Sequence, residues 1–378
     1  MTDEVRRIGI GAWLDRQLAP ESIDDGAVEA AVQARWPRLA LSEAEAMARL
    51  SPFSWDLMFE LQRATLLRMA CSQRQLQEVM VDMWSNHLNV TCPSDKVWAT
   101  RHAYDLAIRL HALGSFRELL RASATSPAML HYLDNADSTG DAPNEDYGRE
   151  LLELHTVGVG AGYSEAEVRM SALALTGFTV YDARRHYVGP LRVLDWGSDN
   201  VSAAGGLAVG LDYLDHLARH PATARRIATL LATRFVCDTP PGALVDRLAA
   251  AYTAHDTAIV PVLRTLFASP EFWSCLGQKL RRPGAAGVGA AERLPRRRGG
   301  LAVDGRDAVA LEPRAGPDPG LVERRREPGR RHLAGADRRS AAGHGGRPGR
   351  PALPAAARPD AAGPGALGAA RALRPGRG

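Results

Sequence analysis

Residues 144–157 read Asn144-Glu-Asp-Tyr-Gly-Arg-Glu-Leu-Leu-Glu-Leu-His-Thr-Val157. Asparagine is a preferred N-cap residue, because its side-chain oxygen accepts a hydrogen bond from a free amide of the first helical turn. Asp146, Glu150 and Glu153 then share one stripe, since a helix turns by about 100° per residue. The stretch therefore predicts a helix from Glu145 to about Val157 and indicates a helical fold around it.

Start signals for further helices lie on both sides of this stretch. Three segments have the Ser-x-x-Glu pattern of a capping box: Ser42-Glu-Ala-Glu45, Ser115-Phe-Arg-Glu118 and Ser164-Glu-Ala-Glu167. Proline follows a capping residue at Ser126-Pro127 and His220-Pro221, as is common at the first helical position. Each signal predicts that a helix begins at that point of the chain.

Apolar residues recur at helical spacing through most of residues 1–280. The predicted helices are 12–18, 22–34, 54–70, 76–90, 94–113, 145–157, 164–175, 207–217, 222–235, 241–254 and 258–267. Residues 178–206 differ, because segments such as Leu191-Arg-Val-Leu194 favour one hairpin or an irregular arm. We expect a mainly α, multi-helix domain with a small irregular or β arm near residues 178–206.

The composition changes near Arg282-Pro283. From Arg281 to Gly378 the chain has no Phe, Tyr, Trp, Ile, Met, Lys, Thr, Asn, Gln or Cys. Such a segment cannot bury enough apolar area to offset its ordering entropy. We predict a helical domain at 1–282 and a low-complexity, disordered tail at 283–378. The Ala, Gly, Arg and Pro of this tail resemble GC-rich coding DNA read out of frame, and a genuine basic tail is the alternative.

The formal net charge of +4 hides a charge difference between the two parts. Residues 281–378 hold 21 of the 47 Lys and Arg and 9 of the 43 Asp and Glu, which leaves about −8 on residues 1–280. An acidic domain argues against a nucleic-acid surface, because that affinity rests on basic side chains at phosphates. The chain contains no apolar run of about 18 residues, so its sequence predicts no membrane-spanning helix. The four scattered cysteines form no C-x-x-C pair.

Several blocks of the sequence resemble a known family. They are Trp84-Ser-Asn-His-Leu-Asn-Val90, Pro127-Ala-Met-Leu-His-Tyr-Leu-Asp-Asn135, the long run from Pro143 to Val157, and Gly162-Tyr-Ser-Glu-Ala-Glu-Val168. In this order they resemble the bacterial "domain of unknown function 1800" family, over about residues 10–283. The chain departs from the family at Asp146, where asparagine is usual, and at Gly148, where alanine is usual.

The resemblance implies a fold and a set of neighbouring genes, but it does not imply a particular reaction. Members are often encoded beside proteins similar to the alkaline phosphatase and sulfatase group, so it implies a protein partner of that group. Members are also often exported. Residues 1–18 here lack the apolar core of a signal peptide, so the chain as written is expected to be cytoplasmic.

The candidate catalytic set is His87, Glu150, Glu153 and His155. Carboxylates at i and i+3 on a helix, with an imidazole from a neighbouring helix, provide oxygen and nitrogen ligands for a divalent metal. His87, Glu150 and Glu153 are therefore the candidate metal ligands of a hydrolase-like enzyme.

The alternative interpretation is structural. Glu150 and Glu153 would form ion pairs with arginines such as Arg101 or Arg109, and His87 would pack in the core. The protein would then be a helical scaffold or partner protein. Both functional classes stay open on the sequence.

A possible anion site lies at the start of the helix after Pro221. His220 and Arg225 flank a helix N-terminus, where free amides and the helix dipole favour anions. Helix capping by His220 is the alternative. The chain has no G-x-S-x-G, H-E-x-x-H or phosphate-binding loop motif.

Overall fold

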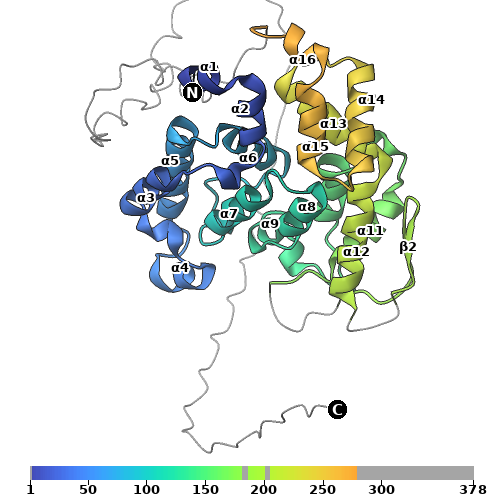
Figure 1. Cartoon of the computed structure of the whole chain (residues 1–378). Helices are drawn as coiled ribbons and strands as arrows, with labels where there is room; N and C mark the ends of the chain where they lie inside the picture. The colour runs from blue at the N-terminus through green and yellow to red at the C-terminus, as the bar shows by residue number, and fades with distance from the viewer. Residues whose placement is uncertain (1, 181–185, 201–204, 279–378) are drawn as a thin grey trace, which may run out of the picture. The chain divides into compact units, whose positions relative to one another are not determined.

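The computed structural model describes residues 2–180, 186–200 and 205–278 (Figure 1). All of them belong to the first of the two units of the chain, Met1–Arg298. The tail predicted at 283–378 lies outside the described residues. The described part is helical apart from one hairpin, so the predicted mainly α fold with a small β arm is confirmed.

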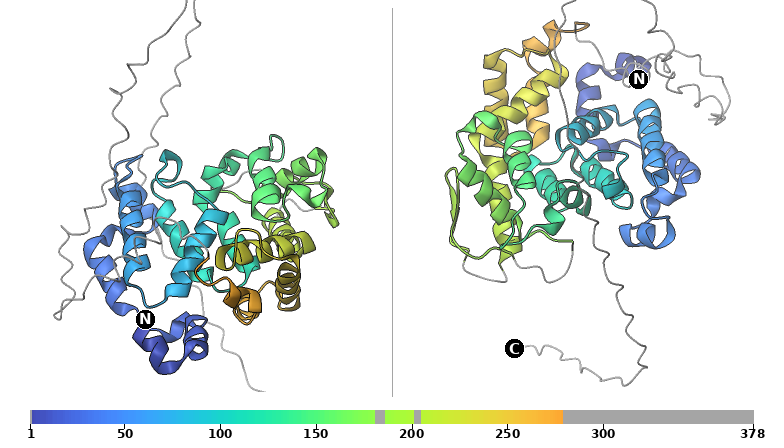
Figure 2. Two further views of the ribbon diagram at one scale, coloured as in Figure 1. Left: turned by 90° about the horizontal axis from the view of Figure 1, so that it is seen from above. Right: turned by 180° about the vertical axis from the view of Figure 1, so that it is seen from behind.

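Helices make up most of the described chain and follow one another in the order of the sequence (Figure 2). They are α1 (Thr2–Ile8), α2 (Ile10–Gln17), α3 (Gly26–Arg35), α4 (Glu43–Arg49), α5 (Asp56–Cys71), α6 (Gln75–His87), α7 (Arg101–His111), α8 (Phe116–Ala124), α9 (Pro127–Tyr132), α10 (Glu145–Glu150), α11 (Glu165–Leu175), α12 (Gly206–Arg219), α13 (Pro221–Phe235), α14 (Gly242–Ala254), α15 (Ile259–Phe267) and α16 (Pro270–Ser274).

Two of the three predicted capping boxes are complete. The hydroxyls of Ser42 and Ser164 accept from the amides of Glu45 and Glu167, and each glutamate returns a bond to the serine amide. At Ser115 only the first bond forms, from the amide of Glu118. These caps join residues three apart, which is why sequence alone locates them.

The predicted helix 94–113 is wrong in its first turns. Only the 3₁₀ turn η3 (Asp95–Val97) forms there, and α7 begins at Arg101. Tertiary contacts hold the segment in another shape, since Asp95 accepts from the indole of Trp55 at 2.6 Å and Lys96 pairs with Asp134 at 2.7 Å. These bonds overrode the local helical preference.

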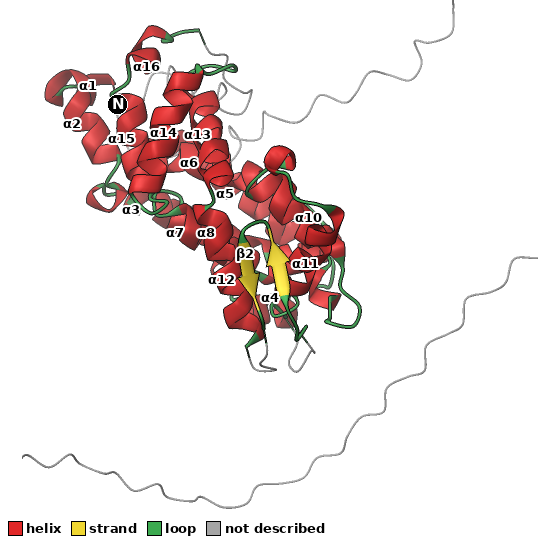
Figure 3. Cartoon of the chain, turned by 90° about the vertical axis from the view of Figure 1, so that its right-hand side faces the viewer, coloured by secondary structure: helices red, strands yellow, loops and turns green. Residues whose placement is uncertain are grey.

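The predicted arm contains a hairpin of two short strands, β1 (Leu191–Val193) and β2 (Trp196–Ser198) (Figure 3). The strands are antiparallel, with Leu191 opposite Ser198 and Val193 opposite Trp196. Leu191 and Val193 are buried while Arg192 is exposed, as alternation along a strand requires. The ring of Trp196 packs on Tyr213 of α12, with centroids 4.7 Å apart, and this contact fixes the hairpin on the helices.

One large hydrophobic core joins α6 to α15. Two of its fully buried aromatic residues also satisfy their polar groups, because Trp84 donates to the carbonyl of Ala112 at 2.9 Å and Tyr104 to that of Leu88 at 2.6 Å. The N-terminal helices are tied to this core by further bonds, among them an ion pair between Asp15 of α2 and Arg264 of α15. This packing places the end of α6 beside the turn that follows α10.

Candidate functional site

The helix predicted at 145–157 forms as two consecutive helical elements, which together run from Glu145 to His155. Asn144 caps α10 as predicted, accepting from the amide of Asp146 at 2.9 Å. After Glu150 the chain widens into one π-helical turn, η5 (Leu151–His155). Such turns leave backbone carbonyls without partners inside the helix and are frequent at functional sites. The carbonyls of Leu154 and His155 are instead bonded to side chains from other helices.

Gly148 lets α10 lie against α11. A Cβ atom at this position would be 2.6 Å from the amide nitrogen of Ala172, closer than real contacts allow. The carbonyl of Gly148 also accepts from the hydroxyl of Ser171 at 3.1 Å. Glycine at this position is therefore required by the close approach of the two helices in this chain.

His87, at the end of α6, bonds to the backbone of η5. Its Nε2 lies 3.0 Å from the carbonyl oxygen of His155. A carbonyl only accepts, so Nε2 carries the proton and Nδ1 keeps a free lone pair in the neutral ring. Burial is the main reason that the pKa of His87 is lowered to about 4; the hydrogen bond to the His155 carbonyl opposes this shift, and the nearby Arg226 guanidinium adds to it. The ring is neutral at pH 7.

His155 is buried and is also neutral at pH 7. Burial lowers its pKa to about 3, with smaller contributions from His87 and Arg226. Its ring meets that of Tyr147 edge-on, with centroids 6.2 Å apart. The Nδ1 atom of His155 and the hydroxyl of Tyr147 have no hydrogen-bond partner within the part of the chain that is described. The side chain of His155 is thus a packed group rather than a partner of His87.

Of the acidic stripe, only Glu153 contacts Arg149, and none of its carboxylates bonds to His87 among the described residues. Glu153 lies 3.4 Å from the Arg149 guanidinium, which also pairs with Glu165 at 2.6 Å. Glu150 has no hydrogen bond or ion pair to the residues at 2–180, 186–200 and 205–278. Its pKa is raised, first by burial and then by the charges of Glu153 and Asp146.

No hydrogen bond joins His87 to Glu150 or Glu153 in the described ranges, and no three His, Cys, Asp or Glu side chains of those ranges are placed to hold a metal ion. The structure does place His87 beside the predicted helix. There its ring bonds to the backbone carbonyl of His155 and not to the predicted carboxylates. That His87, Glu150 and Glu153 bind a metal stays a prediction.

The structural alternative expected Glu150 and Glu153 to pair with arginines such as Arg101 or Arg109, and these partners are wrong. Arg109 pairs with Glu78 at 2.6 Å and approaches Asp105 at 3.7 Å, so its charge is compensated inside the α6–α7 interface. Arg101 donates from Nε to the carbonyl of Val90 at 3.0 Å. Both arginines therefore bond to residues other than Glu150 and Glu153. Arg149 is the cation that compensates the charge of Glu153.

The residues of the predicted anion site bond within the protein. His220 is the cap of α13, because its Nδ1 accepts from the amide of Ala222 at 3.1 Å. Arg225 forms an ion pair with Asp246 of α14. The capping alternative thus describes His220, and anion binding by His220 and Arg225 stays a prediction.

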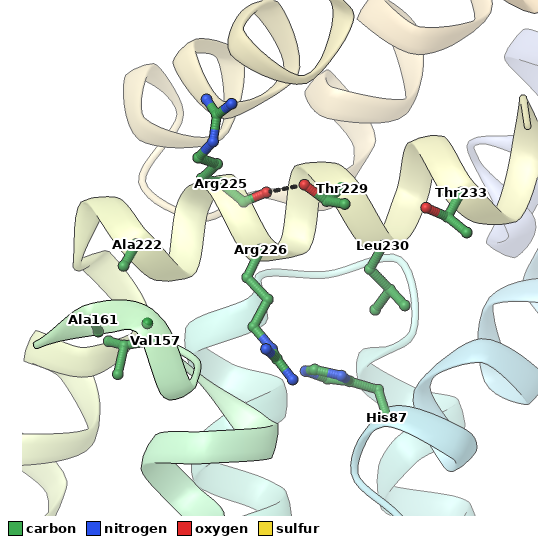
Figure 4. A pocket seen from close by; sticks show the side chains of 10 residues that line it. His87, Val157, Ala161, Ala222, Arg225, Arg226, Thr229, Leu230 and Thr233 are labelled. Atoms are coloured by element: carbon green, nitrogen blue, oxygen red, sulfur yellow. Dashed lines mark hydrogen bonds between the residues drawn. The ribbon is translucent and has the colours of Figure 1, made fainter. Parts of the chain in front are cut away.

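A pocket of about 530 Å³ lies between the end of α6, the turn at 157–161 and α13 (Figure 4). Arg225 points away from it, whereas the guanidinium of the next residue, Arg226, points toward the ring of His87. Arg226 donates to the carbonyl of Leu154 at 3.0 Å. No carboxylate lies within ion-pair distance of Arg226 among the described residues.

Sequence reasoning missed Arg226, although one signal was available. Neighbouring residues on a helix point about 100° apart, so only one residue of the pair Arg225-Arg226 faces any one neighbour. Gly158 explains how Arg226 reaches its place. Its φ of +86° favours glycine, and a Cβ there would be 2.8 Å from the Arg226 guanidinium.

A second feature is an exposed aromatic surface, which we define as Phe53, Trp55 and Phe59. These side chains are 65%, 43% and 39% exposed. The ring of Trp55 meets that of Phe59 edge-on at 6.2 Å, and its indole donates to Asp95 at 2.6 Å. Phe53 has a φ of +62°, which is uncommon for a bulky residue. Phe53 is thus exposed at a point where the backbone adopts an uncommon conformation.

No helix in the described part of the chain has the length and apolarity to cross a membrane. A family model described as "Protein of unknown function (DUF1800)" matches residues 1–312. This match contains the predicted range of about 10–283 and extends beyond it at both ends. No curated protein and no solved structure matches the chain.

Proposed function

Since the chain belongs to the DUF1800 family of proteins of unknown function, we propose a function from its own residues: it is a helical partner protein that binds another protein. The observation that carries this proposal is the exposed aromatic surface of Phe53, Trp55 and Phe59. Aromatic residues are enriched where protein interfaces are buried, and Trp is a frequent anchor of binding energy.

The rigidity of this surface supports binding. Trp55 is fixed by its hydrogen bond to Asp95, and Phe53 lies 6.4 Å from the ring of Trp98. A side chain that is already ordered loses less conformational entropy when a partner covers it. Exposed apolar patches on soluble domains commonly mark such contact sites.

The partner that we propose is a protein of the alkaline phosphatase and sulfatase group, as the family resemblance implies. In this proposal the aromatic surface provides the contact and the partner provides the chemistry. The contacts of two predicted catalytic residues agree with this division, because His87 bonds to a backbone carbonyl and Glu153 to Arg149.

The test is a binding titration of the full chain with a purified protein of that group, followed by calorimetry. Phe53→Ser and Trp55→Ser should each weaken the affinity at least tenfold, since each removes an anchor worth about 1.4 kcal/mol or more. Leu110→Ser is the control, because Leu110 is 78% exposed but lies at the far end of α7. Unchanged affinity in both aromatic variants would contradict the proposal.

A metal-dependent hydrolase that uses His87, Glu150, Glu153 and His155 is the second proposal. One observation favours it: the unpaired Glu150 lies near the charges of Glu153 and Asp146, which a divalent cation would neutralise. Elemental analysis of the purified chain tests it. Stoichiometric metal that is lost in Glu150→Gln and kept in Glu145→Gln would support the hydrolase, and a metal-free chain after loading with Zn²⁺ or Mn²⁺ would exclude it.

A further inference from the structure

We propose that the pocket between α6, the 157–161 turn and α13 binds the carboxylate of a small molecule with a short apolar body. Arg226 would hold the carboxylate, and the neighbouring apolar residues would cover the body of the ligand. This site goes beyond the proposed partner role and does not depend on it, because the aromatic surface lies on other residues.

The charge of Arg226 is available to a ligand. Nearby arginines on the same helix are compensated, since Arg225 pairs with Asp246 and Arg234 with Asp82. Arg226 has no such partner in the described ranges and bonds only to the carbonyl of Leu154, through one terminal nitrogen. Its remaining donors form the planar fork that binds a carboxylate through two parallel hydrogen bonds.

The position of this guanidinium is fixed before a ligand arrives. The Leu154 carbonyl holds one nitrogen, and the Cβ-free surface of Gly158 leaves room for the other. Figure 4 shows the side chain extending from α13 toward His87. An arginine ordered in this way loses little rotamer entropy on binding.

His87 favours a monoanion with a hydrogen-bond donor over a dianion. Its Nε2 is bonded to the His155 carbonyl, so Nδ1 is the ring nitrogen left to a ligand, and its lone pair accepts. A phosphate dianion would bring two charges to one cation beside this acceptor. A carboxylate matches the single charge of Arg226, and an adjacent hydroxyl or amide of the ligand can donate to His87.

The rest of the pocket is mainly apolar. Val157, Ala161, Ala222 and Leu230 line it. The hydroxyl of Thr229, which also borders the pocket, is bonded to the carbonyl of Arg225 at 2.8 Å. A pocket of about 530 Å³ falls in the usual range for small-molecule sites, which combine apolar walls with a few placed polar groups.

Calorimetric titration of the full chain with three probes tests the ligand class. The probes are sodium hexanoate, the uncharged hexanamide with the same apolar body, and inorganic phosphate. We expect saturable binding of hexanoate, with hexanamide and phosphate at least tenfold weaker. Equal binding of hexanoate and hexanamide, tighter binding of phosphate, or no hexanoate binding would each overturn the proposal.

Matched variants test the site. Arg226→Gln should weaken hexanoate binding at least tenfold, whereas Arg225→Gln, which removes the same charge one residue earlier, should change it less than twofold. Circular dichroism checks that both variants fold. A folded Arg226→Gln chain with unchanged affinity, or an equal loss in Arg225→Gln, would overturn the assignment to Arg226.

A second variant blocks the pocket without removing the hydrogen bond between Arg226 and the Leu154 carbonyl. Ala161→Leu adds volume to the pocket wall and keeps the guanidinium and its bond to Leu154, so it should also abolish hexanoate binding. Full binding in this variant would place the ligand elsewhere. Phe53→Ser should leave hexanoate binding unchanged, so failure of the partner proposal and failure of this site are distinguishable.

Discussion

Burial of two histidines couples the stability of this protein to pH. The folded pKa values, about 4 for His87 and about 3 for His155, lie below the ordinary value of 6.5. A group whose pKa is lowered by folding stabilises the protein above its unfolded pKa. That contribution is lost as the pH falls through the folded value, because the unfolded chain binds the proton first.

We therefore predict that the free energy of unfolding falls between pH 6.5 and pH 3, by roughly 3–5 kcal/mol for His155 alone. Urea titrations at pH 7, 5 and 4 measure this loss. His155→Gln removes the titrating group and should give a smaller difference between pH 7 and pH 4. The same difference in wild type and variant would show that His155 does not contribute.

Gly148 reverses the usual ranking of glycine and alanine in a helix. Alanine is favoured by about 1 kcal/mol in an exposed helix, but here its Cβ would lie 2.6 Å from the backbone of α11. Gly148→Ala should lower the free energy of unfolding by about 1–3 kcal/mol, as overpacking does. Gly160→Ala is the control, because no atom lies within 4 Å of its added Cβ. Chemical denaturation of both variants measures the effect.

At the scale of elements, one carboxylate joins α11 to the hairpin. Glu167 accepts from the amide of Ser164 in the capping box at 2.8 Å and from the amide of Leu194 at 2.6 Å. Leu194 has a φ of +53°, so the turn between β1 and β2 is held in an uncommon backbone conformation. The bond to Glu167 helps to keep the turn in place.

The two complete capping boxes allow this tertiary bond to be measured. Glu45→Ala removes a capping-box glutamate without any bond to a distant segment and should cost about 1 kcal/mol. Glu167→Ala removes the same cap together with the Leu194 bond and should cost about 1–2 kcal/mol more. Urea unfolding gives both values. Equal losses would mean that the Leu194 bond adds nothing to stability.

At the scale of the whole molecule, the end of the folded domain is open to test. Composition predicts that the domain ends near Arg282, whereas the family match continues to residue 312. The residues between these points lie outside the described part. We predict that limited proteolysis of the chain leaves a core that ends near Arg282, because arginines from Arg281 onward lie in a segment without aromatic residues.

Mass spectrometry of the protected fragment decides between the two ends. A fragment that ends near residue 312 would show that the family fold includes the first part of the low-complexity segment. Protection of the whole segment to Gly378 would contradict the predicted tail. Denatured chain digested in parallel gives the control for intrinsic cleavage at each arginine.

The sequence by itself determined where several helices begin and which family the chain belongs to. Helix starts at Ser42, Asn144 and Ser164 follow from caps that join residues two or three apart, and the hairpin follows from a local change of pattern. The block around residues 144–157 also carried the family resemblance that the match to residues 1–312 confirms. These features are local, so their energetics are visible in short stretches of sequence.

Only the tertiary structure decided how those elements meet. The end of α10 at Glu150, the bond of His87 to the His155 carbonyl and the close approach at Gly148 depend on segments far apart in the chain. Arg225 is compensated by Asp246 of α14, whereas Arg226 faces the pocket, and this difference likewise depends on how α13 and α14 pack. Partners separated by tens of residues compete for each side chain, and packing, rather than local preference, selects the pairs that form.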